Sequence, residues 1–262
     1  MSVFRLQEWW STQVANEEFA SGCMAVGNLD NSREASDKIA LGSLEGSLRV
    51  YHPSSASFRV DDLLIEEDLN EPILQILTGL FIPMSMNIGI AVLHPRKLVV
   101  YELLLHGSEK GGYHTLEKQY VHDLGVDGQH FSAFNMTSGT FGGAHGRDMI
   151  MVQSMDGKLQ IFEQTANAFT RQFVDCLYPG PLQYLPRLDA FVTVSTSREA
   201  QCFKYQVLAN AQGDIGGSTP TKTGSFGLTA MRSTLMEWSV ILGESCLQIV
   251  EGCFSGTDKG NK

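Results

Sequence analysis

A strand–glycine–strand pattern that occurs twice, 111 residues apart, limits what this chain can fold into. The first copy is DKIALGSLEGSLRVYHP at 37–53 and the second is RDMIMVQSMDGKLQIFE at 147–163, so that Gly46 matches Gly157. Apolar residues alternate on both sides of each glycine, which is the period of a half-buried β-strand. A Glu-Gly or Asp-Gly pair between two such runs supplies the residue that tolerates positive φ in a tight turn. Each copy therefore predicts a β-hairpin.

Two weaker copies extend the pattern to four hairpins, near 37–53, 88–102, 147–163 and 190–207. In each copy an aromatic residue ends the second strand: Tyr51, Tyr101, Phe162 and Tyr205. These residues are 50, 61 and 43 positions apart, and β-propeller blades commonly repeat every ~40–50 residues. The sequence therefore predicts an all-β protein, a β-propeller of which about four to five blades are present.

The predicted propeller occupies residues 1–254, with a polar loop or linker at 209–235 and a disordered tail at 255–262. The longest interval between repeats contains a polar, glycine-rich stretch at 105–118, which we interpret as an insertion between strands. The stretch DDLLIEEDL at 61–69 fits either a short helix or an outer strand with its charges in solvent, and the strand is favoured. No helix is required anywhere in the chain.

The formal net charge of −10 argues against a nucleic-acid binder, which needs a basic surface for the phosphates. Six acidic residues gather between positions 61 and 71: Asp61, Asp62, Glu66, Glu67, Asp68 and Glu71. The favoured interpretation is a solvated face, and the alternative is a docking patch for a basic partner.

Cysteine usage and the amino-terminal residues both predict a reduced, cytosolic protein. The five cysteines show no CxxC spacing: Cys23, Cys176, Cys202, Cys246 and Cys253. No apolar segment typical of a signal peptide opens the chain. Residues 72–93 carry no charge and are long enough to span a bilayer, but Gly79 and Pro83 interrupt them. Two strands joined by the PMSMN turn explain these residues better, so no transmembrane segment is predicted.

Three segments of the sequence are candidates for a chemical site. Four histidines fall eight residues apart, but the intervals cross glycine-rich loops and no single element aligns them: His106, His114, His122 and His130. The glycine-rich stretch at 137–148 fits neither a dinucleotide nor a phosphate loop and predicts an inter-strand loop. Asn28, Asp30 and Ser32 have the alternate spacing of a calcium loop, but only one of them is acidic, which favours an Asx-type turn.

An enzyme built on a propeller places carboxylates and histidines on the strands that line the central channel. The four candidate strands here are GCMAVGNL, PILQILTG, SAFNMTSGTF and GPLQYL, and they contain no Asp, Glu or His. No catalytic, cofactor-binding or metal-binding residue is predicted, and no cofactor. The prediction is that the chain is not an enzyme, and a lactonase or sugar oxidoreductase is the alternative.

Specific motifs in a fixed order add a resemblance to a known family. They are EWWST, LDNS followed by DKIALGS, AVLHPRKLVVY, FNMTSGTFGGAHGRDMIMVQSMDGKLQIFEQ, PGPLQY and FKYQVLA. In this order they resemble the amino-terminal propeller of the PTHB-type subunit of the BBSome, the Bardet–Biedl syndrome coat complex. The resemblance is close over residues 1 to about 210 and weak over 237–251, and its most specific part is 134–164.

The resemblance implies a non-catalytic scaffold subunit of a complex that coats membranes and carries signalling receptors into and out of cilia. It implies the other BBSome subunits as direct partners, and an Arf-like GTPase and ciliary membrane cargo as indirect ones. It implies a location in the cytoplasm and the cilium, at the basal body and on the ciliary membrane. No catalytic residue is carried over.

The sequence departs from this family in the number of blades. The family's propeller has seven and continues into an ear-like β-sandwich and helical parts, whereas four to five blades are recognisable here. We therefore expect a shortened chain with an exposed apolar blade face, poorly soluble or marginally stable alone. A generic cytosolic propeller that serves as an interaction module in another assembly is the alternative function.

Overall fold

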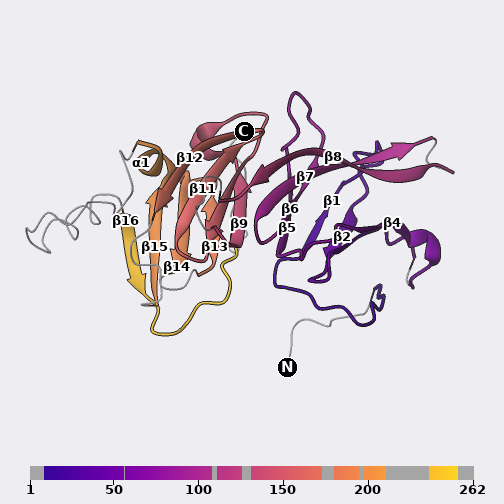
Figure 1. Ribbon diagram of the computed structural model, residues 1–262, viewed down its shortest axis with the longest axis horizontal. Coiled ribbons are helices and arrows are strands. Elements are labelled where there is room, and N and C mark those ends of the chain that lie inside the picture. The colour runs from indigo at the N-terminus through magenta and orange to yellow at the C-terminus, as the bar shows by residue number, and fades with distance from the viewer. Residues whose placement is uncertain are drawn as a thin grey trace, which may run out of the picture. The chain divides into compact units, whose positions relative to one another are not determined.

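The computed structural model describes residues 9–55, 57–107, 111–125, 131–172, 180–194, 198–210 and 236–252. These residues form four antiparallel sheets of four strands each, in which every strand pairs with the next one along the chain (Figure 1). Four-stranded sheets repeated in this way are the blades of a β-propeller, so the predicted all-β fold class is confirmed. The chain divides into two compact units, Met1–Ala133 and Phe134–Lys262, each containing two of the sheets.

The first unit contains sheets 1 and 2. Sheet 1 consists of β1 (Met24–Gly27), β2 (Lys38–Gly42), β3 (Ser47–Tyr51) and β4 (Leu63–Asp68), with the 3-10 turn η1 (Val60–Asp62) before β4. Sheet 2 consists of β5 (Gln75–Gly79), β6 (Gly89–Leu93), β7 (Lys97–His106) and β8 (Tyr113–Asp123).

The second unit contains sheets 3 and 4. Sheet 3 consists of β9 (Ala133–Gly139), β10 (Met149–Ser154), β11 (Lys158–Glu163) and β12 (Ala166–Gln172), with the 3-10 turn η2 (Phe141–Gly143) after β9. Sheet 4 consists of β13 (Leu182–Leu185), β14 (Ala190–Val194), β15 (Glu199–Lys204) and β16 (Met236–Ile241). The short helix α1 (Tyr205–Asn210) follows β15.

The repeated sequence pattern corresponds to the two middle strands of each sheet. Gly46 and Gly157 lie in the β2–β3 and β10–β11 turns with φ of 102° and 81°, which other residues rarely adopt. A Cβ on Gly46 would also lie 2.9 Å from the carbonyl oxygen of Glu71. The glycine in this turn is therefore required both by its φ and by the close approach of another backbone.

Each sheet carries a β-bulge at the same place, between its third and fourth strands. The pairing register shifts at Tyr51, Tyr101, Phe162 and Phe203, and all four aromatic side chains are buried. The expectation that Tyr205 ends the fourth repeat is therefore wrong, because Phe203 holds that place and Tyr205 begins α1. A period of two cannot distinguish these residues, since positions 203 and 205 would lie on the same face of a strand.

Each unit has its own apolar core between its two sheets. In the first unit Ala40, Leu48 and Val50 of sheet 1 pack against Ile76 and Ile90 of sheet 2. In the second unit Met149, Met151, Leu159 and Ile161 of sheet 3 pack with residues of sheet 4, namely Leu182, Tyr184, Phe191 and Phe203. Alternate residues of each strand face these cores, as a strand buried on one side requires.

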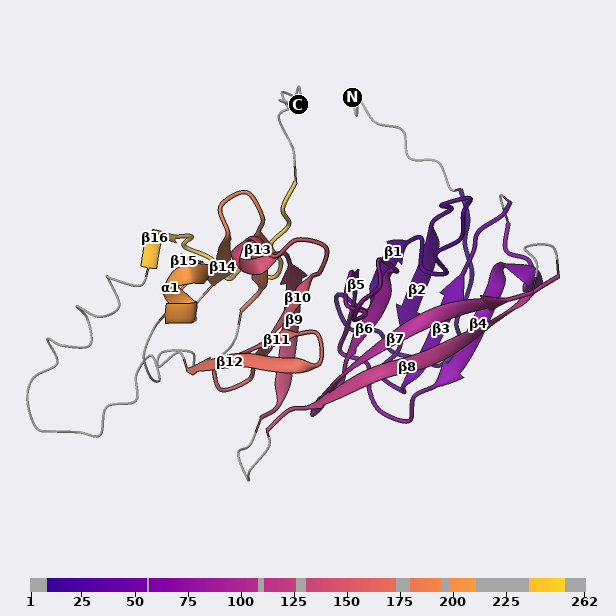
Figure 2. The same cartoon turned by 90° about the horizontal axis from the view of Figure 1, so that it is seen from above.

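Three predictions about segments are settled by the strands. Residues 72–93 form β5, a turn and β6, as expected, and within the described part of the chain no helix is long and apolar enough to span a membrane. Residues 61–69 contain the outer strand β4. The polar stretch at 105–118 does not loop out between strands: it lengthens β7 and β8 into a hairpin that runs past the other strands of sheet 2 (Figure 2).

The expected linker and tail lie mostly outside the described residues. Ala209 and Asn210 belong to α1, so the predicted start of the linker at 209 is wrong, and 211–235 is not described. The expectation that no helix is needed is also wrong, because α1 is a short helix. The predicted tail at 255–262 lies outside the described residues.

Candidate interaction surfaces

The first strand of each sheet supplies no group for acid–base or metal chemistry. β1, β5, β9 and β13 fall within the four segments expected to line a channel, and these described strands contain no Asp, Glu or His. Across the described residues there is also no group of three or more His, Cys, Asp or Glu side chains placed to hold a metal ion.

The loop that resembles a calcium site is filled by a lysine of the same chain. The buried ammonium of Lys38 lies 3.3 Å from Asn28 Oδ1 and 2.8 Å from Ser32 Oγ, and it forms an ion pair with Asp30. Burial opposes ionisation of Asp30, but the hydrogen bond and charge of Lys38 and the hydrogen bonds from Ser32 together outweigh it and hold the pKa of Asp30 below its usual value. The Ser32 N–H donates to Asp30 Oδ1 at 3.1 Å, which confirms the Asx-type turn.

The regularly spaced histidines do not converge. His106 hydrogen-bonds Thr115 at 2.7 Å and stacks on Tyr113, while His114 lies 3.4 Å from Asp30. His122 packs edge-on against Tyr120, and His130 lies outside the described residues. Each described ring thus has its own neighbour, and the histidines form no shared site, but the expectation that no single element aligns them is wrong for His114 and His122, which both lie on β8.

The acidic residues of 61–71 divide into structural and exposed groups. Asp62 is buried and accepts hydrogen bonds from Trp10 Nε1 at 3.1 Å, Ser54 Oγ at 2.6 Å and the Arg59 N–H at 2.9 Å. The interpretation of the whole group as a solvated face is therefore wrong for Asp62. Glu66 pairs with Arg49 and Glu71 pairs with Lys97, while the remaining three are exposed: Asp61, Glu67 and Asp68.

The glycine-rich stretch 137–148 connects β9 to β10 and packs into the core of the second unit. Phe141 is buried with its ring 4.6 Å from Tyr184 and 4.8 Å from Phe191. Asp189 accepts a hydrogen bond from the Gly142 N–H and another from the Tyr184 hydroxyl, both at 2.9 Å. This loop is therefore an inter-strand connection, as expected, with a structural role.

The described cysteines are free thiols. Cys23 and Cys202 are buried, and burial raises the pKa of both, which keeps them protonated and unreactive. Cys246 is partly exposed, and Cys176 and Cys253 lie outside the described residues.

The face of sheet 1 that points away from sheet 2 is partly covered by residues 9–20, which we name the N-terminal strap. Arg49 donates two hydrogen bonds of 2.7 Å to the carboxylate of Glu17 on the strap. Leu44 N–H donates to the carbonyl of Glu18 at 2.8 Å, and Trp10 packs on Tyr51 with its ring 5.6 Å away. Met24 and Val26 of β1 remain exposed on the same face.

Residues 242–252, which we name the C-terminal segment, contact the face of sheet 4 that points away from sheet 3. Ile249 of this segment packs against Ala190, Val192 and Cys202. The segment is also joined to Arg198 by two backbone-carbonyl hydrogen bonds of 2.9 Å.

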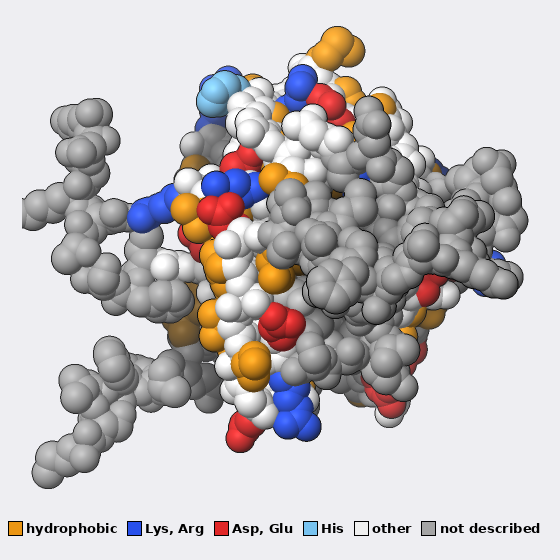
Figure 3. All heavy atoms as spheres, turned by 90° about the vertical axis from the view of Figure 1, so that its left-hand side faces the viewer, with side chains coloured by type: hydrophobic (Ala, Val, Ile, Leu, Met, Phe, Trp, Pro, Cys, Tyr) orange, Lys and Arg blue, Asp and Glu red, His pale blue; other side chains and the backbone are white. Residues whose placement is uncertain are grey.

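Along the edge strand β16 this face of sheet 4 stays open. Val240 is 54% exposed and Trp238 is 39% exposed, and they pair in register with Ala200 and Cys202 on the covered part of the face. Figure 3 views the molecule from the side on which β16 lies in Figure 1, and the visible hydrophobic side chains there are interspersed with charged and polar ones.

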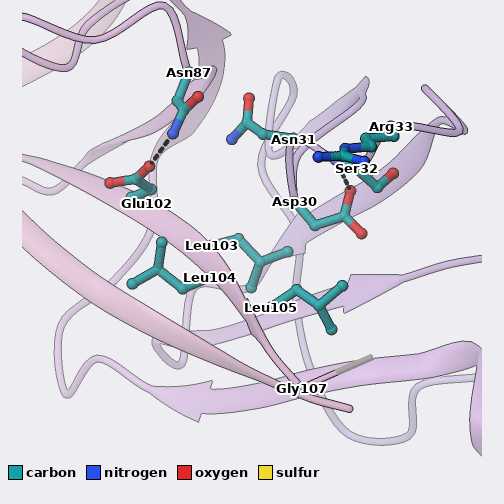
Figure 4. A pocket seen from close by; sticks show the side chains of 10 residues that line it. All are labelled: Asp30, Asn31, Ser32, Arg33, Asn87, Glu102, Leu103, Leu104, Leu105 and Gly107. Carbon is teal, nitrogen blue, oxygen red and sulfur yellow. Dashed lines mark hydrogen bonds between the residues drawn. The ribbon is translucent and has the colours of Figure 1, made fainter. Parts of the chain in front are cut away.

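A pocket of about 470 Å³ lies in the first unit between the loop at 28–33 and the extended part of β7. Glu102 and Asn87 lie at one end, Asp30, Ser32 and Arg33 lie at the other, and the leucines of β7 lie between them (Figure 4). No local sequence pattern predicts this pocket, since its walls come from segments about 70 residues apart.

Four repeated four-stranded antiparallel blades place this chain among the β-propellers. The model of the family described as PTHB1 N-terminal matches residues 1–259, and the chain belongs to this family.

Individual relatives agree with this assignment. Protein PTHB1 of Xenopus laevis is 40% identical over 264 residues, which cover 98% of this chain and 30% of that protein. Protein PTHB1 of Homo sapiens is 40% identical over 256 residues, covering 95% of this chain and 28% of that protein. The Caenorhabditis elegans pthb1 homolog is 26% identical over 184 residues, covering 70% of this chain and 22% of that protein. The chain thus spans under a third of the length of these relatives.

Among solved structures, the crystal structure of BBS1N in complex with ARL6DN, soaked with lead, is similar over 88% of this chain and 71% of that chain. The sequence identity is 11% and the TM-score is 0.45, and a likeness at this level carries no argument about function.

Proposed function

We propose that this chain is a non-catalytic scaffold part of the BBSome, the coat-like complex that moves cargo receptors into and out of cilia. The observation that carries the proposal is the match to PTHB1 proteins along nearly the whole chain, at 40% identity over 98% of its residues. The fold is consistent with this role, because the described residues form blades with open faces and no cluster of catalytic type.

Its partners are the other BBSome subunits, with an Arf-like GTPase and ciliary membrane cargo as indirect ones. It acts in the cytoplasm and at the cilium, at the basal body and on the ciliary membrane as part of the complex. The alternative is a cytosolic propeller that provides an interaction surface in a different assembly. Co-purifying proteins distinguish the two.

The test is affinity purification of the tagged 262-residue chain from ciliated cells, followed by mass spectrometry of the bound proteins. Recovery of BBSome subunits supports the proposal, and recovery of a different stable assembly supports the alternative. A Gly139→Val chain is the control, because a side chain at Gly139 would lie 2.4 Å from Tyr184 and disrupt the second unit. Chaperones alone with both chains would contradict an assembly role for this chain.

A further inference from the structure

The β7–β8 hairpin leaves part of a strand edge unpaired. β6 pairs with β7 only as far as Tyr101, whereas β8 continues to pair with β7 as far as His106. On the β6 side, no backbone hydrogen bond from a described residue reaches Leu103–His106. An unpaired edge of this kind is a template for the addition of another strand.

The pocket lies along this free edge. At about 470 Å³ it is within the size range of ligand pockets and has room for a few residues of an extended peptide. Leu103 and Leu105 line it, so its middle is apolar, while its two ends are polar (Figure 4). A strand that adds to β7 would place alternate side chains into this pocket.

One end of the pocket holds a carboxylate that has no cation beside it. Glu102 is 9% exposed, and its oxygens accept hydrogen bonds from the side-chain amides of Asn87 at 2.7 Å and Gln119 at 3.0 Å. Among the described residues it forms no ion pair. A nearly buried carboxylate held only by neutral amides has room for a charge-assisted bond from a Lys or Arg side chain.

The other end holds the cation of Arg33, which forms no ion pair with a described residue. Asp30 is already paired with Lys38, and His114 lies 3.4 Å away from it. Arg33 is exposed at this end of the pocket and forms no hydrogen bond or ion pair with a described residue. The two ends therefore differ in the charge that they can accept.

We propose that the free edge of β7 over Glu102–His106, with the pocket beside it, binds an extended segment of a partner protein. This segment carries a basic side chain that reaches Glu102 on one face of β7 and, three residues away and on the opposite face, an acidic side chain that reaches Arg33. Main-chain hydrogen bonds to β7 supply affinity, and the two charges set the direction and register of the segment. The inference goes beyond the proposed scaffold role and does not depend on it.

Two synthetic hexapeptides test the proposal, acetyl-Thr-Lys-Val-Thr-Glu-Thr-amide and the same peptide with Lys and Glu exchanged. Each is titrated into the full chain, with binding followed by fluorescence anisotropy of a labelled copy. We expect one order to bind, to slow hydrogen exchange within 102–106, and to bind about tenfold more tightly than the order with exchanged charges. A peptide with Gln in place of both charges should bind about as weakly as the exchanged order.

Substitutions in the pocket distinguish binding that depends on its charges from non-specific binding. Glu102→Gln should weaken the preferred peptide about tenfold, and Arg33→Glu should favour a peptide with Lys at both positions. Glu67→Gln, which changes an exposed acid on β4, is the control and should leave binding within about twofold. Arg33 is exposed, so its replacement tests the proposal even if Glu102→Gln lowers stability.

Three outcomes would overturn the proposal. The first is that neither peptide binds at millimolar concentration. The second is that the preferred peptide binds the Glu102→Gln and Arg33→Glu variants as tightly as the unaltered chain. The third is that free lysine binds as tightly as the preferred peptide. The last result would indicate a small-molecule pocket instead of strand addition. Failure here would leave the affinity purification from ciliated cells unaffected.

Discussion

Sheets 1 and 4 each present one face that no neighbouring sheet of their own unit covers, and the two faces are protected by different means. On sheet 1 the N-terminal strap is held by the Arg49–Glu17 ion pair and by Trp10, whose indole N–H donates to buried Asp62. On sheet 4 the C-terminal segment contributes one apolar contact, Ile249, and two backbone-carbonyl hydrogen bonds with Arg198.

The two faces differ in whether directional hydrogen bonds or non-directional apolar contacts hold the covering segment. Several hydrogen bonds to charged groups fix a segment in one geometry, whereas a single side chain on an apolar face can be replaced by any surface of similar shape. The strap therefore fixes part of sheet 1 and leaves Met24 and Val26 exposed, while sheet 4 is exposed along its edge at Trp238 and Val240.

The largest expected loss of stability comes from releasing the N-terminal strap from sheet 1. Replacing Asp62 with Ala leaves the Trp10 indole, the Ser54 hydroxyl and the Arg59 N–H without their buried acceptor. We expect a loss of about 3 kcal/mol in the free energy of unfolding, measured by denaturant titration. Asp61→Ala, at the exposed neighbour, should change it by less than ~0.5 kcal/mol. Equal effects of the two substitutions would mean that Asp62 does not hold the strap.

The core between sheets 3 and 4 should be nearly as sensitive to substitution as the contacts of Asp62. A Cβ on Gly139 would lie 2.4 Å from the buried ring of Tyr184, which Phe141 and Phe191 hold in place. Gly139→Ala should therefore cost about 2 kcal/mol. Gly143→Ala is the control, with φ of 74° and no atom within 4 Å of the new Cβ, and it should cost roughly 1 kcal/mol. A Gly139→Ala chain as stable as the control would show that the ring can move aside.

The cover of sheet 4 should be weaker. Ile249 is half-buried, and its replacement by Ala should cost about 1 kcal/mol and speed hydrogen exchange in β14 and β15. Val250→Ala, at an exposed neighbour, should have no measurable effect. If Ile249→Ala lowered the free energy of unfolding as much as Asp62→Ala, the two covering segments would be held equally strongly.

Mild acid should lower the stability of the first unit more than that of the second. His94 is fully buried with Nδ1 2.9 Å from the Pro72 carbonyl, and burial lowers its pKa below the usual 6.5. The unfolded chain binds a proton near pH 6.5 that the folded chain does not, so this stability is present above pH 6.5 and is lost as the pH falls toward the lower folded pKa. We expect a smaller loss than for the substitutions above.

The measurement is denaturant unfolding between pH 7.5 and about 5, with hydrogen exchange to locate the change. His94→Gln should remove this part of the pH dependence, and His145→Gln, at an exposed histidine of the second unit, should leave it in place. Retention of the full pH dependence in the His94→Gln chain would assign it to other groups.

The smallest effect on stability is expected at the open edge of sheet 4. Ile241 is 79% exposed, so Ile241→Lys should change the free energy of unfolding by less than ~0.5 kcal/mol. The same change should delay aggregation of the isolated chain, followed by light scattering, because a charge on an edge strand opposes pairing with another chain. Unchanged aggregation would mean that the chains associate through a different surface. Val60→Lys, at an exposed residue of η1, is the matched control.

The hairpins and the fold class could be predicted because a period of two and a turn glycine are local properties. The register could not be predicted to the residue, since the bulge that selects Phe203 over Tyr205 preserves the same alternation. The burial of Asp62 was missed because an acidic residue in an acidic run is normally exposed, and its donors lie up to 52 residues away. The pocket was missed for the same reason, as its ends meet only after sheets 1 and 2 pack.

The lysine that fills the calcium-like loop has a consequence for the cell. Lys38 is tethered to the loop that it neutralises, so its effective concentration there is fixed by a few covalent bonds and does not follow the surrounding ions. A calcium-dependent loop folds when the metal is released into a compartment and loosens when it is pumped out. This loop instead keeps one shape through such pulses, and removal of calcium by a chelator should leave it unchanged.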